Sequence, residues 1–258
     1  MNKIKIGLVQ ITSGLDPIDN LQKIEKQLVQ AKNERLDCVF LPECFYSLGN
    51  GLSPTPYLIQ TPSPNRPGND HYLAVMNLAK KYQISLLGGS AATEENGKIY
   101  NRVLNFNGEG QDLGHYDKIN LFRCNLNQQS NKTVIDETKN YHPGNTPRLL
   151  HLPQLQMNLG LSVCFDLRFP ELFRNYTRQG ANALSISAAF TVPTGKAHWH
   201  TLLRARAIEN QCFVFASAQW GVHNERISTF GHSLVIDPWG VVLADGGEGE
   251  KLVTAEVD

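Results

Sequence analysis

Cys164 stands where the chain is expected to turn from a strand into a helix. In segment 155–163 apolar residues alternate with other residues over the length of a typical strand. Pro170 and Glu171 fit the first turn of a helix, because proline lacks an N–H that would be unpaired there and a carboxylate favours the positive helix end. A thiol at such a turn is open to a substrate and lies near free backbone N–H groups that can stabilise an oxyanion. This setting suits a nucleophile.

Two charged residues follow other apolar runs. Glu43 comes directly after the run 38–41, and Lys118 lies in a short polar part of segment 116–122. A cysteine thiol has an ordinary pKa near ~8.5, so it needs a base or a nearby positive charge to act as a nucleophile at neutral pH. Glu43 can take the thiol proton and Lys118 can supply the charge.

In these three motifs the sequence resembles the nitrilase superfamily, the carbon–nitrogen hydrolases. LPE with Glu43, YDKINLF with Lys118 and VCFDLRFPE with Cys164 match the family's glutamate, lysine and cysteine in order and in setting. Glu137 in DETKNYHPG is similar to the family's second glutamate, which precedes a Pro-Gly turn. The resemblance covers essentially the whole chain. In segments 188–219 and 231–240 it is closest to the branch of deaminated glutathione amidases and related ω-amidases.

The resemblance implies a mechanism. Glu43 would take the proton of Cys164, which attacks the amide carbonyl, and Lys118 together with the backbone N–H of Phe165 would hold the oxyanion. Protonated Glu43 would then release the amine and later activate the water that hydrolyses the thioester. Glu137 would hold Lys118 in place and orient the substrate.

Arg168 is a candidate for substrate binding. It lies four residues after Cys164, where family members that act on carboxylate-bearing substrates have an arginine. A guanidinium can hold a carboxylate through two parallel hydrogen bonds, which would fix the far end of the substrate. The structural alternative is a salt bridge, for example with Glu171.

The other candidates also have structural interpretations. A free cysteine such as Cys164 is often buried as a small hydrophobic residue. Glu43 and Lys118 could form an ordinary ion pair, since charged residues at loop ends are usually solvated. Glu137 is adjacent to Asp136 in a polar segment, and either could simply face solvent.

The elements expected around these residues alternate between strand and helix. Strands are expected at 3–11, 37–41 and 84–88, with helices at 17–35 and 70–82. This β-α-β-α-β order predicts an α/β protein with layered sheet and helices and with strand ends gathered on one side. The resemblance implies more specifically a four-layer α-β-β-α sandwich. Segment 46–69 is rich in Pro, Gly, Ser and Asn and is expected to be a loop at a pocket rim.

The second half of the chain continues the pattern. A hairpin is expected from segments 100–107 and 112–116, which would deliver Lys118, and residues 123–144 are expected to be loop. The later elements are expected as a strand at 183–187, a helix at 196–210 and strands at 212–218, 232–236, 241–244 and 252–257.

Composition restricts the class of protein. The 258 residues are 41% hydrophobic, which allows one large domain, and we expect a single domain over residues 1–258. Twenty-four basic residues balance 24 acidic ones without a basic run, so no nucleic-acid or membrane partner is expected. The chain has no uninterrupted apolar run of membrane-spanning length and no signal-peptide pattern, and its 5 cysteines lack CxxC spacing. A soluble cytoplasmic protein is therefore expected, and family members commonly form homodimers.

No cofactor or metal is expected from the sequence. No glycine-rich phosphate loop precedes a helix, and no His/Cys/Asp motif with metal-ligand spacing is present. His198 and His200 lie two residues apart in a predicted helix, where their side chains point to nearly opposite faces.

These observations predict a cofactor-free cysteine amidohydrolase that acts on a small ω-amido acid, with deaminated glutathione as the best single substrate. The alternatives are an ω-amidase acting on 2-oxoglutaramate, a carbamoylase or a true nitrilase, because the same residues serve all of them. A non-catalytic binding protein that retained the fold is the alternative from another class.

Overall fold

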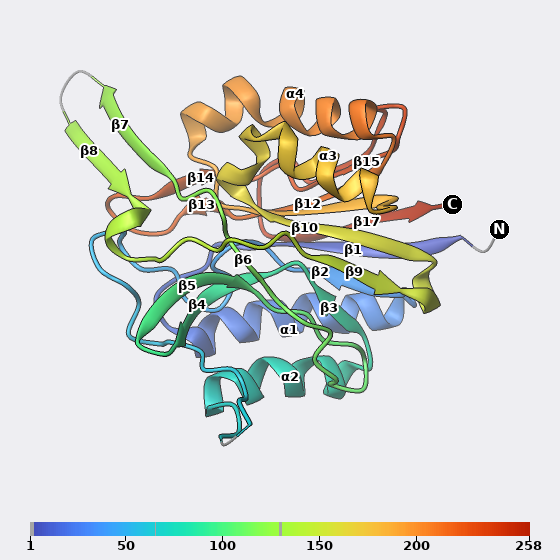
Figure 1. Ribbon diagram of the computed structural model, residues 1–258, viewed down its shortest axis with the longest axis horizontal. Helices are drawn as coiled ribbons and strands as arrows, with labels where there is room; N and C mark the ends of the chain where they lie inside the picture. Colours follow the sequence, from blue (N-terminus) through green and yellow to red (C-terminus); the bar gives the residue numbers. More distant parts are fainter. Residues whose placement is uncertain (1–2, 65, 129–130) are drawn as a thin grey trace.

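Two sheets pack face to face in the computed structural model, and helices cover the outer side of each sheet (Figure 1). The structure describes residues 3–64, 66–128 and 131–258. The first sheet contains, in spatial order, β17 (Lys251–Val257), β1 (Ile4–Gln10), β2 (Cys38–Phe40) and β3 (Ser85–Leu87). The second contains β16 (Val242–Asp245), β15 (Leu234–Ile236), β12 (Phe213–Ala218), β11 (Ala183–Ala188), β10 (Met157–Val163) and β9 (Leu149–Leu152).

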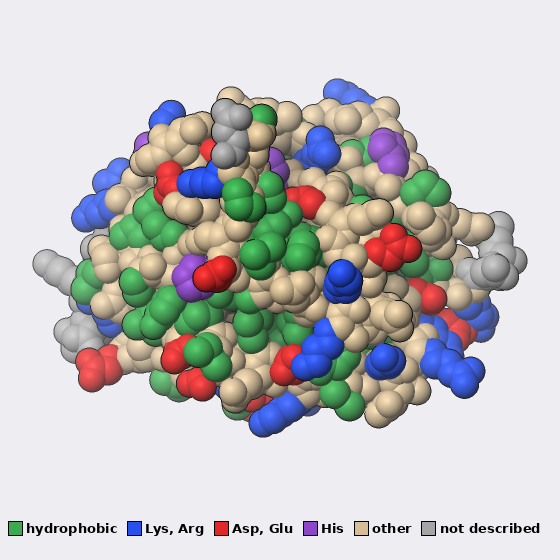
Figure 2. All heavy atoms as spheres, turned by 90° about the horizontal axis from the view of Figure 1, so that it is seen from below, with side chains coloured by type: hydrophobic (Ala, Val, Ile, Leu, Met, Phe, Trp, Pro, Cys, Tyr) green, Lys and Arg blue, Asp and Glu red, His purple; other side chains and the backbone are tan. Residues whose placement is uncertain are grey.

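Two pairs of helices form the outer layers. Helices α1 (Pro17–Asn33) and α2 (Asp70–Tyr82) cover the four-stranded sheet, and α3 (Pro170–Arg178) and α4 (Val192–Asn210) cover the six-stranded sheet. The result is the α-β-β-α sandwich that the resemblance implied. No helix among the described residues is both long enough and apolar enough to cross a membrane. The face that carries α1 and α2 shows acidic and basic side chains interspersed rather than gathered by sign (Figure 2).

Three hydrophobic cores separate the four layers, because successive residues of a strand point to opposite faces. In β1, Ile6 and Leu8 are buried between the two sheets, whereas Val9 packs with the helix layer of α1 and α2. In β12, Phe215 belongs to the core between the sheets, whereas Val214 packs beneath α3 and α4. Strands buried on both faces explain the nearly continuous apolar runs in the sequence.

Parallel pairing brings functional strand ends together. β1, β2 and β3 are parallel to one another, and so are β10, β11 and β12. Glu43 follows β2 and Cys164 follows β10 directly. The connections after these strands therefore lie at the carboxyl ends of the two inner sheets, where α/β proteins commonly place their sites.

The expected hairpin of segments 100–107 and 112–116 is present, because Val103 pairs antiparallel with Tyr116 and Phe106 forms an antiparallel bridge with Asp112. A further hairpin, which was not predicted, precedes it. β4 (Ser90–Glu95) pairs antiparallel with β5 (Lys98–Val103), and β5 then pairs with β6 (Tyr116–Asp117). Asn96 and Gly97 form the turn with φ of 52° and 74°, as a two-residue Asn-Gly hairpin turn requires. The segment SAATEE lacks the branched apolar residues that indicate a strand, so β4 was not predicted.

The expectation of a loop at residues 123–144 is wrong for its first half. β7 (Arg123–Gln128) and β8 (Asn131–Asp136) pair antiparallel and project from the body of the molecule (Figure 1). Two short helical turns follow in the chain, η1 (Glu137–Lys139) and η2 (Pro153–Leu155). The small strands β13 (Trp220–Val222) and β14 (Ser228–Phe230) form a further antiparallel pair.

The starts of β10 and α4 also differ from expectation. β10 begins at Met157 rather than at 155, because Gln156 adopts a left-handed φ of 47° that closes η2. Helix α4 begins at Val192 rather than at 196, because Pro193 fits its first turn.

Candidate active site

Cys164 occupies a tight turn between β10 and the short helix η3 (Cys164–Arg168), after which α3 begins. Its φ of 48° lies in the left-handed region, which is unfavourable for a residue with a side chain and is held by the surrounding structure. The carboxylate of Asp166 accepts a hydrogen bond from the backbone N–H of Val163 at 3.0 Å, which fixes the turn from the inside. Cys164 as a whole residue is half-buried, and it lines a pocket.

Lys118 lies between two carboxylates in the same pocket. Its Nζ donates to Glu43 Oε1 at 2.9 Å and lies 2.8 Å from Glu137 Oε2. The Lys118 side chain is 1% exposed and that of Glu43 is 4% exposed, so both charges are removed from water and depend on each other.

Further hydrogen bonds hold Glu43. Its Oε1 also accepts from the Asn101 side chain at 2.9 Å, and its Oε2 accepts from the backbone N–H of Ala189 at 2.9 Å. Asn101 belongs to β5, and Ala189 directly follows β11. Both carboxylate oxygens are therefore oriented by elements of the rigid scaffold.

Glu137, rather than the adjacent Asp136, points to Lys118. Glu137 Oε2 accepts from the backbone N–H of Phe122 at 2.7 Å, while Asp136 accepts from the backbone N–H of Thr138 at 3.1 Å and so caps η1. The structure thus brings together four residues that the sequence analysis singled out: Glu43, Lys118, Glu137 and Cys164.

The pKa shifts follow from burial and from these charges. Burial and the Glu43 carboxylate raise the pKa of the Cys164 thiol well above its ordinary value, although Lys118 and the Ala189 N–H oppose this. Burial alone would lower the pKa of Lys118, but the carboxylates of Glu137 and Glu43 outweigh it and raise that pKa, so the ammonium stays charged. Burial also raises the pKa of Glu137, against the opposing charge of Lys118.

A buried carboxylate, Asp166, joins the Cys164 turn to the Lys118 segment. Asp166 Oδ2 accepts from the Tyr116 hydroxyl at 2.8 Å, and Oδ1 accepts from both the backbone N–H and the side chain of Asn120 at 2.9 Å. Burial raises the pKa of Asp166 even though these hydrogen bonds favour the charged form. Because Tyr116 and Asn120 flank Lys118, this network sets the position of Lys118 relative to Cys164.

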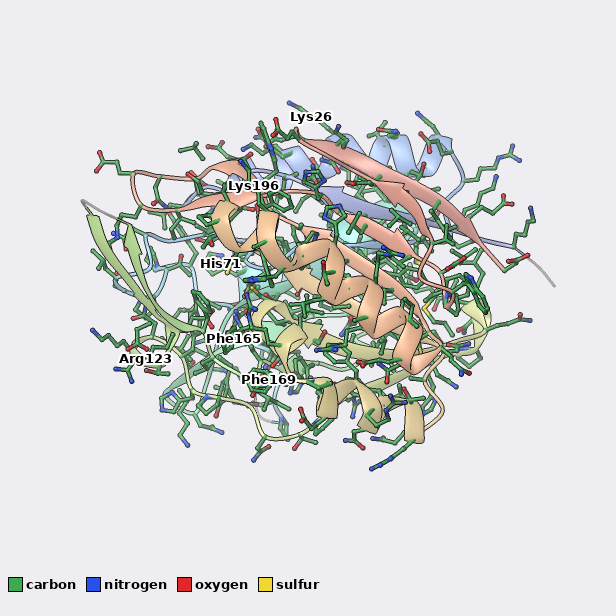
Figure 3. All side chains as sticks on the ribbon, turned by 90° about the horizontal axis from the view of Figure 1, so that it is seen from above. Lys26, His71, Arg123, Phe165, Phe169 and Lys196 are labelled. Atoms are coloured by element: carbon green, nitrogen blue, oxygen red, sulfur yellow. The ribbon has the colours of Figure 1, made fainter. Side chains whose placement is uncertain are left out.

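Arg168 and Phe165 lie on the pocket wall. The guanidinium of Arg168 lies over the rings of Phe165 and Phe190 at 5.8 and 5.6 Å, and its Nη2 is 3.3 Å from His198 Nδ1. Within the described part of the chain it forms no ion pair with a carboxylate, Glu171 included. Phe165 packs against Phe169 at the start of α3 (Figure 3). As the second residue of η3, Phe165 has a backbone N–H without a partner inside that helix.

Sequence reasoning missed the residues that support the site from other elements. Asn101 offered a weak signal, a polar residue within the otherwise strand-like segment 98–103. Asp166 and Tyr116 lie within the motifs VCFDLRFPE and YDKINLF, but their pairing across 50 positions depends on the fold. The backbone N–H of Ala189 has no signal in the side-chain pattern.

Known proteins resemble this sequence over nearly its whole length. The family profile described as carbon-nitrogen hydrolase matches residues 5–258. A deaminated glutathione amidase from Synechocystis sp. is 39% identical over 256 residues, which cover 97% of this chain and 90% of that protein. An omega-amidase from Saccharomyces cerevisiae is 33% identical over 261 residues, which cover 99% and 87% of the two chains.

Solved structures of related proteins have the same fold as this chain. The crystal structure of the NitFhit protein of Caenorhabditis elegans matches with a TM-score of 0.86 at 34% identity, covering 100% of this chain and 61% of that one. A nitrilase-superfamily protein from Saccharomyces cerevisiae matches with a TM-score of 0.86 at 32% identity, covering 99% and 90% of the two chains. An amidase from Nesterenkonia sp., at 22% identity and a TM-score of 0.80, shares the fold.

Proposed function

Because the chain belongs to the carbon–nitrogen hydrolase family, we propose that it hydrolyses the amide bond of a small ω-amido acid through a thioester on Cys164, with deaminated glutathione as the substrate. One observation carries the proposal. The Lys118 ammonium is shared between Glu43 and Glu137 in the pocket that Cys164 lines. This arrangement provides a nucleophile, a base and a fixed positive charge without a metal.

In the first step Glu43 takes the thiol proton as Sγ of Cys164 attacks the amide carbonyl carbon. The raised pKa of Cys164 supports this assignment, because a thiol that holds its proton needs an adjacent base. A C–S bond forms and the carbonyl oxygen becomes an oxyanion, which Lys118 and the backbone N–H of Phe165 stabilise.

In the second step the C–N bond breaks and Glu43 gives its proton to the leaving nitrogen. A water then enters, Glu43 takes one of its protons, and the hydroxide attacks the thioester carbonyl. Collapse of that intermediate releases the carboxylic acid and returns the proton to Cys164. Glu137 holds Lys118 throughout and orients the substrate.

Arg168 would bind a carboxylate of the substrate. The described structure leaves its guanidinium without a carboxylate partner on the pocket wall, which supports this role. An Arg168→Lys substitution keeps the charge but loses the planar fork, so KM for a carboxylate-bearing amide should rise about tenfold or more, with a smaller change for a neutral amide.

The proposal is tested by comparing kcat/KM for deaminated glutathione and for 2-oxoglutaramate, following the 2-oxoglutarate that each releases. A ratio well above one supports the proposed substrate, because the cysteinylglycine part then contributes to transition-state binding. A ratio below one favours the second candidate, an ω-amidase, which the similarity to the yeast omega-amidase supports. Activity on neither would direct the search to carbamoyl compounds and nitriles.

The test of catalysis itself is the Cys164→Ala variant, with Cys212→Ala as the control because Cys212 is buried beneath α4. Intact mass spectrometry during turnover should find an acyl group on the wild type and on the control, and none on Cys164→Ala. A Cys164→Ala protein that hydrolyses every amide as fast as the wild type would leave the fold as a binding protein without this mechanism.

We also propose that residues 1–258 form one domain, that the protein is a cytoplasmic homodimer, and that small amides are its partners. The free thiols of Cys38, Cys44, Cys164 and Cys212 support a reducing compartment. Exposed apolar residues on α4 and near β16 support the dimer: Ile208, Trp239, Val241 and Leu243. Light scattering of the wild type and of Trp239→Asp tests the proposed dimer. The mass of a monomer measured for both proteins would oppose it.

A further inference from the structure

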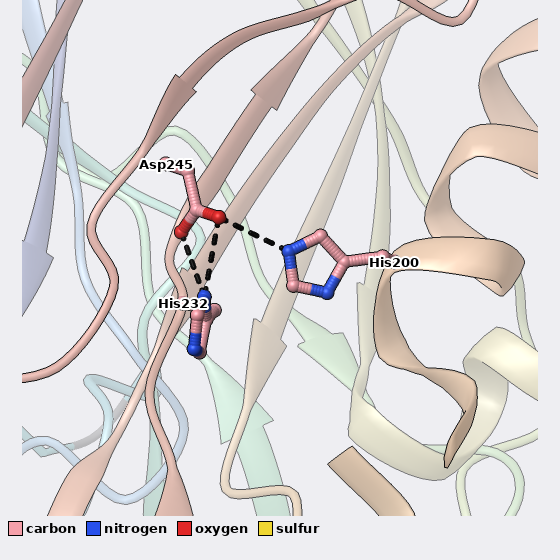
Figure 4. A group of neighbouring side chains, drawn as sticks. All are labelled: His200, His232 and Asp245. Carbon is pink, nitrogen blue, oxygen red and sulfur yellow. Dashed lines mark hydrogen bonds and ion pairs between the residues drawn. The ribbon is translucent and has the colours of Figure 1, made fainter. Parts of the chain in front are cut away.

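His200, His232 and Asp245 form a cluster outside the pocket of Cys164, and we call them the His-Asp cluster (Figure 4). His200 lies on α4, His232 lies just before β15, and Asp245 ends β16. His200 Nε2 is 3.1 Å from Asp245 Oδ2, and His232 Nδ1 is 2.9 Å from Oδ1 and 3.2 Å from Oδ2. Three elements of the fold thus present one potential ligand atom each to a single point.

The spacing of these atoms suits coordination. Both imidazole nitrogens lie beside the same carboxylate oxygen, and the three ligand atoms are within 4.8 Å of one another. At an ion about 2.1 Å from both atoms of a pair, the 3.1 Å pair would subtend about 95° and the 3.2 Å pair about 99°. These angles lie between octahedral and tetrahedral geometry.

Neighbouring groups hold two of the three residues, Asp245 and His232. The backbone N–H of Gly247 donates to Asp245 Oδ1 at 2.8 Å, and the ring of Phe230 stacks on His232 at 4.3 Å. Trp199 Nε1 donates to the carbonyl of His232 at 2.7 Å and so ties that residue to α4. His232 itself adopts a φ of 56°. These contacts hold Asp245 and His232 in place without an ion.

Charge and exposure also suit a cation. The side chains of His200, His232 and Asp245 are 38%, 24% and 35% exposed, so an ion can enter and keep water ligands. In the part of the chain that the structure describes, no lysine or arginine pairs with Asp245. Two imidazoles and one carboxylate form a ligand set that suits borderline ions such as zinc.

We propose that the His-Asp cluster binds one divalent transition-metal ion, and that the ion clamps α4 to the ends of β15 and β16. The site is separate from the proposed reaction and does not depend on it. Trp199, which is hydrogen-bonded to His232, also packs on Phe190 of the pocket wall at 4.8 Å and so connects the cluster to the pocket. The competing interpretation is a hydrogen-bonded His–Asp–His contact with no ion.

The test is titration of the full-length, chelator-treated protein with ZnCl2 by calorimetry and with CoCl2 by visible absorption. Both are done in the Cys164→Ala background, so that the active-site thiol cannot supply a ligand. We expect one ion per chain, a cobalt spectrum without thiolate charge transfer, and a rise in Tm of about 5 °C with zinc present in large excess over Kd.

His200→Gln separates the two interpretations, because glutamine still donates a hydrogen bond to Asp245 but removes the imidazole ligand. This variant and Asp245→Asn should lose at least about tenfold in metal affinity and lose the zinc-dependent rise in Tm, with the metal-free Tm of His200→Gln unchanged. His151→Gln, which alters an exposed histidine paired with Asn158, should bind as the parent does. Absence of binding in the parent, or equal binding by His200→Gln, would overturn the proposal.

Discussion

The buried ion pairs of Lys118 make a quantitative prediction for Lys118→Met. Methionine keeps the length of the side chain but removes the ammonium that neutralises Glu43 and Glu137, which are 4% and 16% exposed. Breaking a buried pair by removing one partner typically costs about 3–5 kcal/mol. Glu43 keeps two hydrogen-bond donors and Glu137 keeps one, so we expect a loss of about 4 kcal/mol in the free energy of unfolding. For a chain of this size that is a fall in Tm of about 8–16 °C.

The loss should depend on pH. Burial already raises the pKa of Glu137, and without Lys118 nothing of comparable strength opposes that shift. A carboxyl whose pKa is higher in the folded than in the unfolded state destabilises the fold fully above its folded pKa. The deficit shrinks as the pH falls through that value toward the unfolded one. Lys118→Met should therefore lose less stability at about pH 5 than at about pH 7.5.

Urea unfolding followed by circular dichroism at the two pH values measures both effects. The double variant Lys118→Met/Glu137→Gln should recover part of the stability, since it removes one of the two carboxylates that lose their counter-charge. Lys81→Met is the matched control, because Lys81 pairs with Glu25 at 2.7 Å on an exposed surface and its loss should change little. A free energy of unfolding for Lys118→Met within about 1 kcal/mol of the wild type at both pH values would show that Lys118 does not stabilise the fold in this way.

Three further substitutions test the site and the packing of the elements around it. Glu43→Gln should lower kcat by about 10²–10⁴-fold, because the proposed base is lost, and a rate within threefold of the wild type would remove Glu43 from that role. Asp166→Asn should cost about 1–3 kcal/mol of stability and lower kcat, since its amide must face one of the buried donors; unchanged unfolding and kinetics would contradict this. Gly195→Ala should lower the free energy of unfolding by about 1–3 kcal/mol, because the added Cβ would lie 2.3 Å from the Phe230 side chain. Gly14→Ala is the control in the same unfolding assay and should be tolerated, because no atom lies within 4 Å of its added Cβ.

The elements predicted well are those whose stability is local. Helix α2 has the predicted bounds, and the Asn69 side chain caps it by accepting from the backbone N–H of Tyr72. β4 and β7 were missed because their sequences are polar and their strand form depends on pairing with β5 and β8. The Asn96-Gly97 turn was the available signal for β4.

The same distinction holds for the site. Glu43, Lys118 and Cys164 could be found because each lies in a short ordered motif, and the structure places them together. Asn101, which orients Glu43, has no motif because its partner lies 58 positions away. The two histidines of the His-Asp cluster are separated by 32 residues, so only the packing of α4 on the sheet brings them together.

The pairing of β1 with β17 has a consequence for the order of assembly. The two strands are joined by seven paired positions from Ile4–Val257 to Gln10–Lys251, so the first and last strands are neighbours (Figure 1). During synthesis β1 leaves the ribosome on the order of ten seconds or more before its partner exists. For that time one edge of β1 exposes unpaired backbone groups, which are a template for association with other chains. Completion of the four-stranded sheet is therefore necessarily a late event in biosynthesis, and the nascent chain is most exposed to aggregation before β17 closes that edge.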